Sequence, residues 1–206
     1  RVHGYIAEGL FADEADIAHS AEHQLGSQVR PGDIKYRDVN GDGIINELDE
    51  VMISPYGRRP RIQYGFGVNL RWRNWDLGVF FNGSAKRSIY INGIAPFGDD
   101  LCNVMSFIAE DYWSESNPNP NAKYPRLGVN ANDVKNNSVI STYWLRNGNF
   151  LRLKTLELGY NFKFGRVYVN GDNLAVWSPF KLWDPELSWN AYPLSRTVTL
   201  GVQLKF

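Results

Sequence analysis

The stretch of sequence that decides the fold is Ile62-Gln63-Tyr64-Gly65-Phe66-Gly67-Val68-Asn69-Leu70-Arg71-Trp72. Every second residue of this stretch is apolar, and the residues between them are polar or glycine. Successive side chains of a strand point to opposite faces, so the pattern predicts a strand with one apolar face. The stretch is longer than the roughly 5–6 residues of an average soluble strand and matches the roughly 9–11 tilted residues that cross a bilayer.

The same alternation predicts further strands at 75–82, 150–163, 166–176 and 197–206. The turn before the first of these is Arg73-Asn74, where asparagine tolerates the positive φ of a tight hairpin, and we expect that strand to continue to about Asn92. Trp72 and Trp75 flank the turn, which is typical of an interfacial aromatic girdle. Near Leu153 the apolar parity of its strand switches, which predicts a bulge or a strand leaving the apolar band. Residues 2–10 are predicted to form a weaker strand.

Long and short connections alternate along this series. The segments 11–60, 93–149 and 177–195 are long, which is rare for compact soluble domains and typical of the extracellular loops of outer-membrane barrels. Six strands cannot close a barrel, since about eight is the smallest common size. We therefore predict an all-β fold in which residues 1–206 are the C-terminal six or so strands of a larger transmembrane antiparallel β-barrel. Residues 31–60 and 93–149 would be extracellular loops, and a soluble β-sandwich is the alternative.

Composition limits the classes of function. The chain has 206 residues with 22 Lys+Arg and 22 Asp+Glu, and this zero net charge argues against nucleic-acid binding. Cys102 is the one cysteine, so we expect neither an internal disulfide nor a Cys-based zinc site. The apolar runs are much shorter than a transmembrane helix needs. The chain starts at Arg1 without a signal-like segment, and we interpret it as a piece of a longer protein, with plug and N-terminal domains absent.

One segment matches the twelve-residue calcium loop of EF-hands. Oxygen donors stand at loop positions 1, 3, 5, 7, 9 and 12, and glycine stands at position 6, where the loop must turn sharply. The predicted Ca²⁺ ligands are Asp38, Asn40, Asp42, Ile44 through its carbonyl, Asn46 and Asp49. The last position holds Asp49 in place of the usual glutamate, so its carboxylate reaches less far toward the ion. We predict a structural Ca²⁺ that stabilises an exterior loop. A metal-free turn is the alternative.

Two other patterns are weaker. His19, Glu22 and His23 match the H-x-x-E-H pattern of zinc peptidases but lack a third ligand, and we interpret them as part of a short polar helix in an exterior loop. Trp113, Tyr124 and Trp144 lie among amides and carboxylates, which suits either stacking on a sugar or peptide or packing of the loop itself. Because no Ser/His/acid order or elbow motif is present, we predict that the chain is not an enzyme.

Several segments together resemble the SusC/RagA family of TonB-dependent outer-membrane transporters, in the family's order. The resemblance rests on 8–11, 31–43, 75–81, 143–154, 167–174, Trp183-Asp184-Pro185-Glu186, 192–196 and the terminal Phe206. It implies a 22-stranded barrel with a plug, in the outer membrane of a Gram-negative bacterium of the Bacteroidota type. It further implies active import of glycan oligosaccharides or peptides, driven by the TonB complex through the absent N-terminal part.

The same resemblance implies partners. A SusD-like surface lipoprotein would cap the barrel, and two transporter–lipoprotein pairs would form a dimer, surrounded by outer-membrane lipid. Alternatives from other classes stay open at this point: a secreted calcium-bearing β-rich binding module, a zinc peptidase and a passive porin.

Overall fold

The structure is a computed structural model that describes residues 1–91, 104–130, 132–187 and 191–205. The chain divides into two compact units. The sheet unit comprises Tyr56–Ile89 and Arg146–Phe206, and the loop unit comprises Arg1–Pro55 and Tyr90–Leu145. The described residues contain mostly strands, and their helices are too short to cross a membrane.

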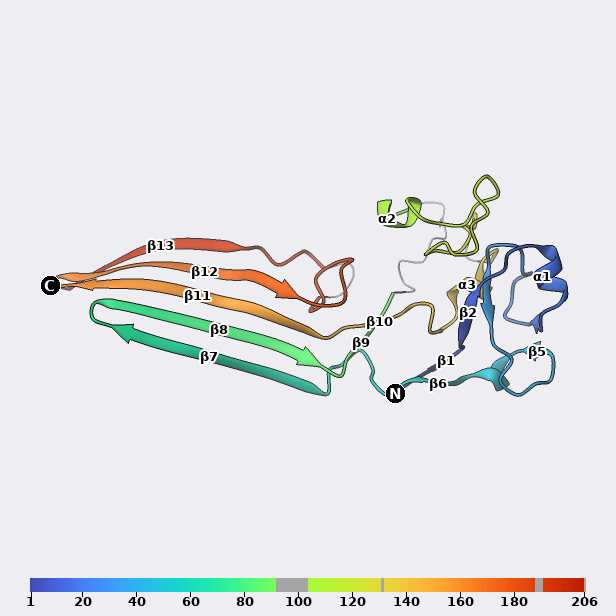
Figure 1. The fold of residues 1–206 in the computed structure, drawn as a ribbon, viewed down its shortest axis with the longest axis horizontal. Helices are drawn as coiled ribbons and strands as arrows, with labels where there is room; N and C mark the ends of the chain where they lie inside the picture. The colour runs from blue at the N-terminus through green and yellow to red at the C-terminus, as the bar shows by residue number, and fades with distance from the viewer. Residues whose placement is uncertain (92–103, 131, 188–190, 206) are drawn as a thin grey trace. The chain divides into compact units, whose positions relative to one another are not determined.

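The sheet unit is built on one antiparallel sheet of five strands in the order β13-β12-β11-β8-β7 (Figure 1). Its strands are β7 (Ile62–Trp72), β8 (Trp75–Ala85), β11 (Phe150–Phe162), β12 (Gly165–Trp177) and β13 (Thr197–Leu204). The alternating segments of the sequence therefore became these strands, as predicted. The second strand ends earlier than expected, because Lys86 takes a positive φ of 55° and the short β9 (Ser88–Tyr90) follows. Asn92 and Phe206 lie outside the described residues.

The register places the apolar residues of all five strands on one face. One row across the sheet runs Leu70–Leu77–Leu158–Val169–Leu200, and the row beside it runs Trp72–Trp75–Tyr160–Val167–Val202. The opposite face carries the rows Arg71–Asp76–Gly159–Tyr168–Gly201 and Asn69–Gly78–Glu157–Asn170–Thr199. A shift of one residue would exchange the two faces, so the hydrophobic pattern itself specifies this register.

Two local irregularities accompany the strands. The pairings of β11 with β8 and with β12 both shift register between Leu153 and Thr155, which confirms the bulge predicted from the parity switch. In the β7–β8 turn the positive φ, 53°, falls on Arg73 and not on Asn74 as expected. The two-residue hairpin itself is present, since Trp72 and Trp75 are paired.

Residues 2–10 do not join the sheet, so the expected sixth barrel strand is wrong. They form β1 (Val2–Gly4), which pairs with β6 (Val51–Ser54), and β2 (Ala7–Leu10), which pairs with β4 (Ile34–Tyr36). Between them the Tyr5 amide donates to Ile140 O at 2.8 Å. This local pairing places residues 2–10 in two small sheets of the loop unit.

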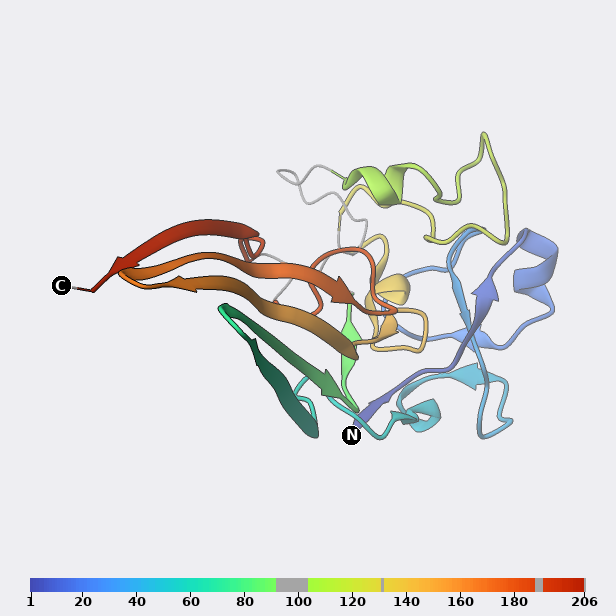
Figure 2. The same cartoon turned by 60° about the vertical axis from the view of Figure 1, so that its left-hand side comes forward.

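Two of the three segments expected to be separate long loops, 11–60 and 93–149, fold together for most of their length as the loop unit (Figure 2), whereas 177–195 belongs to the sheet unit. Its other elements are α1 (Glu14–Ala18), β3 (Glu22–His23) parallel to β5 (Ile44–Ile45), the 3₁₀ turn η1 (Glu47–Asp49), α2 (Ser106–Ala109) and α3 (Lys135–Ser138). The strand β10 (Leu145–Asn147) begins at the last residue of the loop unit and continues into the sheet unit. The buried core of the loop unit includes Phe11, Ile34, Ile45, Ile108 and Trp144. These apolar residues are scattered in the sequence without a regular period, so no pattern predicted the core they form.

Candidate functional site

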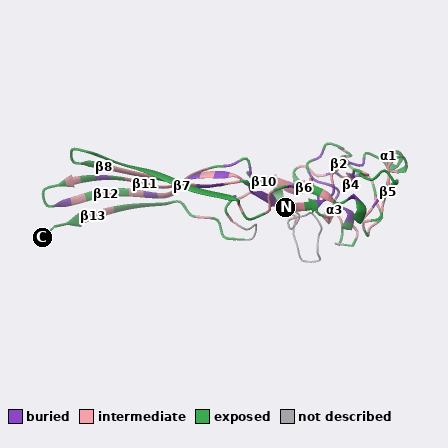
Figure 3. Cartoon of the chain, turned by 90° about the horizontal axis from the view of Figure 1, so that it is seen from below, coloured by how far each residue is buried: buried purple, intermediate pink, exposed green. Residues whose placement is uncertain are grey.

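The apolar face of the sheet unit is exposed. Every residue of β7 is exposed, as its green colour in Figure 3 shows. The exposed fractions reach 57% for Leu70, 66% for Trp72 and 75% for Leu200. Contiguous apolar patches on soluble monomers rarely exceed a few hundred Å², because each Å² kept in water costs about 25 cal/mol. A face that is apolar across five paired strands therefore needs an apolar environment such as lipid.

Aromatic residues gather on this face at the end with the tight turns. Trp72 pairs with Trp75 across the turn, and the Trp75 ring meets Tyr160 edge-on at a centroid distance of 4.9 Å. Phe162 and Phe164, near the β11–β12 turn, are exposed as well. Tryptophan and tyrosine are typical of membrane interfaces, where the ring is apolar and its polar atom meets water. The arrangement fits the girdle expected from the sequence.

The opposite face carries an ion-pair network across three strands. Arg166 on β12 binds Asp76 on β8 and lies 2.6 Å from Glu157 Oε1 on β11. The Asn161 amide donates to Asp76 Oδ2 at 2.6 Å. A Cβ at Gly159 would lie 2.6 Å from Arg166 Nε, so this glycine leaves the space through which the guanidinium crosses the sheet. The small residues on the polar face thus make room for long side chains of neighbouring strands.

The predicted calcium loop forms a tight turn closed by its own hydrogen bonds. Gly41 and Gly43 both have positive φ, 79° and 82°, a backbone conformation that glycine adopts without strain. The Asp38 carboxylate accepts from the Gly41 amide at 2.6 Å and from the Gly43 amide at 2.7 Å. Asp42 Oδ1 accepts from the Ile44 amide at 2.8 Å, and its Oδ2 accepts from the Asn40 side chain. Asn40 and Asp42 are exposed to solvent.

Asp49 is buried beneath this loop. Its Oδ1 accepts from the Val39 amide at 2.8 Å, and its Oδ2 accepts from the Asn46 amide at 3.0 Å in a capping box. Desolvation by burial works to raise the pKa of Asp49, but the backbone N–H groups of Asn46, Val39 and Asn40 outweigh it and lower the pKa. Asp49 therefore acts as the internal brace of the loop.

The donor set of the loop is chemically suited to a hard cation, because carboxylate, amide and carbonyl oxygens are what Ca²⁺ prefers. The side chains of the loop are not arranged as they would be around a bound ion. Among the described residues, no group of three or more acidic, histidine or cysteine side chains converges as metal ligands do. Asp38 and Asp42 instead hold backbone amides, so an ion would have to compete for these oxygens.

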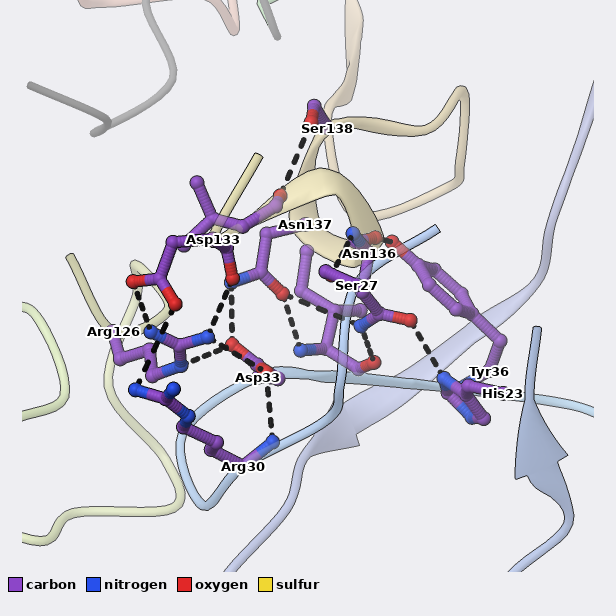
Figure 4. Close-up of polar contacts among 12 residues, drawn as sticks. His23, Ser27, Arg30, Asp33, Tyr36, Arg126, Asp133, Asn136, Asn137 and Ser138 are labelled. Carbon is purple, nitrogen blue, oxygen red and sulfur yellow. Dashed lines mark hydrogen bonds and ion pairs between the residues drawn. The ribbon is translucent and has the colours of Figure 1, made fainter. Parts of the chain in front are cut away.

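A buried polar network joins distant parts of the loop unit, and the sequence analysis missed it (Figure 4). Arg126 Nε lies 2.7 Å from Asp33 Oδ1, and both side chains are almost fully buried. Asn137 donates to the same Asp33 oxygen at 2.7 Å and accepts from the Ile34 amide at 2.8 Å. Desolvation by burial raises the pKa of Asp33, and the charge of Arg126 opposes that rise. Because Asn137 and Asp33 are 104 residues apart, no local signal could have revealed the pair.

The histidine pattern does not form a zinc site. The helix α1 ends at Ala18, so His19 and His23 do not share a helix, and the short helix expected there is only five residues long. His19 Nδ1 donates to Ala15 O at 2.6 Å. His23 lies on β3, where Nδ1 donates to Asn136 Oδ1 at 2.7 Å and the ring stacks 5.6 Å from Tyr36. Desolvation lowers the pKa of His23, so this ring is a neutral packing residue at neutral pH.

The three candidate ligand-binding aromatics are core residues. Trp113, Tyr124 and Trp144 are 6%, 5% and 0% exposed. The Trp144 indole N–H donates to Asn137 O at 2.7 Å, and Gly32 lies against the Trp113 ring, where no Cβ would fit. Burial favours the packing alternative that the sequence left open for these rings.

Comparisons with known proteins agree with this geometry. No family model matches the chain. TonB-dependent receptor P26 of Formosa agariphila is 31% identical over 202 residues, which cover 85% of this chain and 20% of that protein. TonB-dependent receptor SusC of Bacteroides thetaiotaomicron is 26% identical over 194 residues, which cover 86% of this chain and 18% of that protein. The chain thus spans about a fifth of the length of the curated relatives it matches.

Solved structures give the same fold. The structure of the RagAB peptide transporter has a TM-score of 0.66 and 22% identity, covering 99% of this chain and 22% of that one. The RagAB peptide importer in its closed-closed state has a TM-score of 0.65 at 20% identity, covering 99% of this chain and 23% of that one.

The two-faced sheet with its exposed apolar side first defines the class, an outer-membrane β-protein. The relatives then add a likeness in sequence: the chain is similar to a segment of the SusC-type TonB-dependent receptors, which confirms the resemblance seen in the sequence. TonB-dependent receptors of this kind are outer-membrane proteins of Bacteroidota, and the chain shares that location. The relatives carry the names of receptors and transporters and not of enzymes.

Proposed function

We propose that the sheet unit is part of the wall of a TonB-dependent barrel that imports oligomeric nutrients across the outer membrane. The observation that carries the proposal is the exposed apolar face backed by a polar, ion-paired face. Lipid contact on one side and a hydrated lumen on the other explain both faces at once. The strands β7 and β13 stand at the two edges of the described sheet, and closure into a larger barrel would pair such edges.

The finer architecture follows from the family. We infer that the chain supplies late strands of a 22-stranded barrel whose plug lies elsewhere in the full-length protein. A SusD-like lipoprotein would cap the barrel, with two such pairs in a dimer, and the TonB complex would supply energy. RagAB, whose solved structures share this fold, is described as a peptide transporter and importer. For this chain both oligosaccharides and peptides are candidate substrates.

The proposed mechanism involves no bond-making chemistry by these residues. The loop unit would take part in capture at the cell surface. It contains most of the segments 31–60 and 93–149, which would be extracellular. The polar sheet face would then line the path of the substrate. A secreted binding module is the weaker candidate, because it would hold the apolar face of β7 in water.

Uptake by the full-length gene product tests the proposal. We expect cells that express it to take up labelled oligosaccharide or oligopeptide pools only when TonB is present. Purification in mild detergent should recover a surface lipoprotein in the same complex. Uptake that persists without TonB would identify a passive porin, and a product found soluble outside the cell would overturn the membrane assignment.

A structural Ca²⁺ in the loop 38–49 is a second proposal. It is supported by the spacing of oxygen donors and by the surface position of Asn40 and Asp42. When bound, the ion would cross-link the turn; the residues that would hold it are Asp38, Asn40, Asp42, Ile44, Asn46 and Asp49.

Calcium retention tests this second proposal. We expect the full-length protein to retain radioactive calcium in equilibrium dialysis, and the double variant Asp38→Asn/Asp42→Asn to lose it. The variant Asp16→Asn is the matched control, since Asp16 is an acidic residue of the same unit that pairs with Lys35 at 2.8 Å outside the loop. No retention by the unmodified protein at millimolar calcium would show a metal-free turn.

A further inference from the structure

The polar face of the sheet unit carries an open hollow of about 500 Å³. Its lining includes Gln63, Gly65, Phe80, Asn82, Ser84 and Glu186. All of these residues belong to the sheet unit. The volume lies within the roughly 300–1,000 Å³ that is usual for small-molecule sites.

An aromatic ring forms one wall of the hollow. Phe80 is the one large apolar residue in the polar series of β8, and it is 44% exposed. A Cβ at Gly65 or at Gly67 would lie 3.1 Å from atoms of the Phe80 ring, so the ring is seated over these two glycines. The glycines therefore support one side of the ring while much of it stays open. In the sequence, Phe80 is the one residue that breaks the alternation of 75–82.

Beside this ring are two buried polar atoms without partners. Asn82 Oδ1 and Ser84 Oγ are both buried and make no hydrogen bond to the described residues, and both residues line the hollow. Ser84 as a whole is 3% exposed. Buried polar groups in native proteins are nearly always paired, so each orphan indicates a missing partner. A ligand hydroxyl can donate to the amide oxygen and can either donate to or accept from the serine.

The arginines around the hollow already have partners. Arg87 donates to Pro185 O and, at 2.9 Å, to Arg58 O. Arg152 binds both carboxylate oxygens of Asp184, at 2.6 and 2.7 Å, and its Nε lies 3.2 Å from Glu186 Oε2. These contacts also fasten the segment 183–186 against the polar face. Among the described residues, the hollow consequently offers hydrogen bonds and a ring face, and its arginine, Arg87, is already held by two backbone carbonyls.

We propose that this hollow is a subsite for one uncharged sugar ring of an imported oligosaccharide. The C–H face of the sugar would stack on Phe80, and its hydroxyls would hydrogen-bond Asn82 and Ser84. A short peptide is the less suitable occupant, because its charged termini would have to compete with the contacts that already hold Arg87 and Glu186. The inference rests on the proposed import function and gives that function a substrate class.

Binding to the full-length detergent-solubilised protein tests the subsite. The probes are neutral hexasaccharides of glucose, mannose, galactose and xylose, and a pool of neutral hexapeptides with free termini. We expect at least one saccharide to bind, Phe80→Leu to weaken its Kd about tenfold, and Phe80→Tyr to retain it, since tyrosine keeps the ring face. Ser84→Ala should weaken binding severalfold.

The matched control is Phe81→Leu. Phe81 is the next residue on β8 but lies on the apolar face, where it stacks on Phe66 at 5.2 Å. We expect this variant to bind the saccharide within about twofold of the unmodified protein, because only the polar face lines the hollow.

If the Kd for the saccharide is unchanged in Phe80→Leu, the proposed subsite is wrong, and water or another part of the barrel fills the hollow. Binding of the peptide pool alone overturns the substrate class. Uptake separates these results from the proposed function. If uptake depends on TonB while Phe80→Leu has no effect, the subsite alone fails. If uptake by the unmodified protein is independent of TonB, the import proposal fails while the binding result stands.

Discussion

Arg126 neutralises the buried carboxylate of Asp33 and also donates to Asp133 O at 2.8 Å. We predict that Arg126→Met destabilises the loop unit by about 3–5 kcal/mol, because it leaves a buried charge without its partner. Hydrogen exchange of the loop-unit amides in the full-length protein measures the effect. The control is Arg30→Met, whose side chain is 57% exposed and 3.7 Å from Asp133; it should cost no more than about 1 kcal/mol. Equal effects of the two substitutions would contradict the importance of the buried pair.

His23 gives the loop unit a pH dependence. Burial lowers its pKa below the ordinary value of 6.5, with the charge of Lys35 acting in the same direction. Below pH 6.5 the unfolded chain takes up a proton that the folded ring resists, so stability is present above this pH and is lost as the pH falls through it. We expect faster proteolysis of the loop unit at pH 5.5 than at pH 7.5. The variant His23→Gln should remove the contribution of this residue, and an unaltered pH profile in that variant would contradict the account.

At the scale of elements, substitutions on the single strand β7 can compare the two faces of the sheet. Leu70 and Asn69 are neighbours on β7 that point to the apolar and polar faces. We predict that Leu70→Arg lowers the folded fraction of the barrel in outer membranes, because arginine on the lipid face costs up to about 2–4 kcal/mol near the bilayer centre. Asn69→Arg should be tolerated. The folded fraction is measured on a gel as the band whose mobility changes when the sample is heated. A similar loss of this band in both variants would argue against lipid contact.

The long strands could be predicted from sequence because a period of two is a local signal. The bounds of β7 follow from the alternation alone, and the switch of parity near Leu153 marked the position at which the register shifts. The loop unit could not be predicted, since its contacts join residues such as Asp33 and Asn137 that no short pattern links. The weak strand at 2–10 failed for a related reason, because its apolar residues were also compatible with local pairing to β4 and β6.

Prediction of site residues was also uneven. The calcium loop is a fixed-spacing motif, so its turn and its glycines could be placed from the sequence, while the inward position of Asp49 depends on tertiary burial. The aromatic candidates Trp113 and Trp144 have the composition of a binding loop but pack inside the unit. Phe80 needed the register of two strands, because only pairing places it over Gly65 and Gly67.

At the scale of the molecule, the sheet unit is a wall segment with two different environments. The account requires lipid on one side of β7 and an aqueous lumen on the other. The most direct measurement uses single spin-labelled cysteines at Val68, Asn69, Leu70 and Arg71. The full-length protein would carry Cys102→Ser and be studied in lipid bilayers, with access compared between oxygen and a water-soluble nickel complex. The account predicts strict alternation, with oxygen access dominant at 68 and 70 and nickel access dominant at 69 and 71. Uniform access to the nickel complex at all four positions would contradict it.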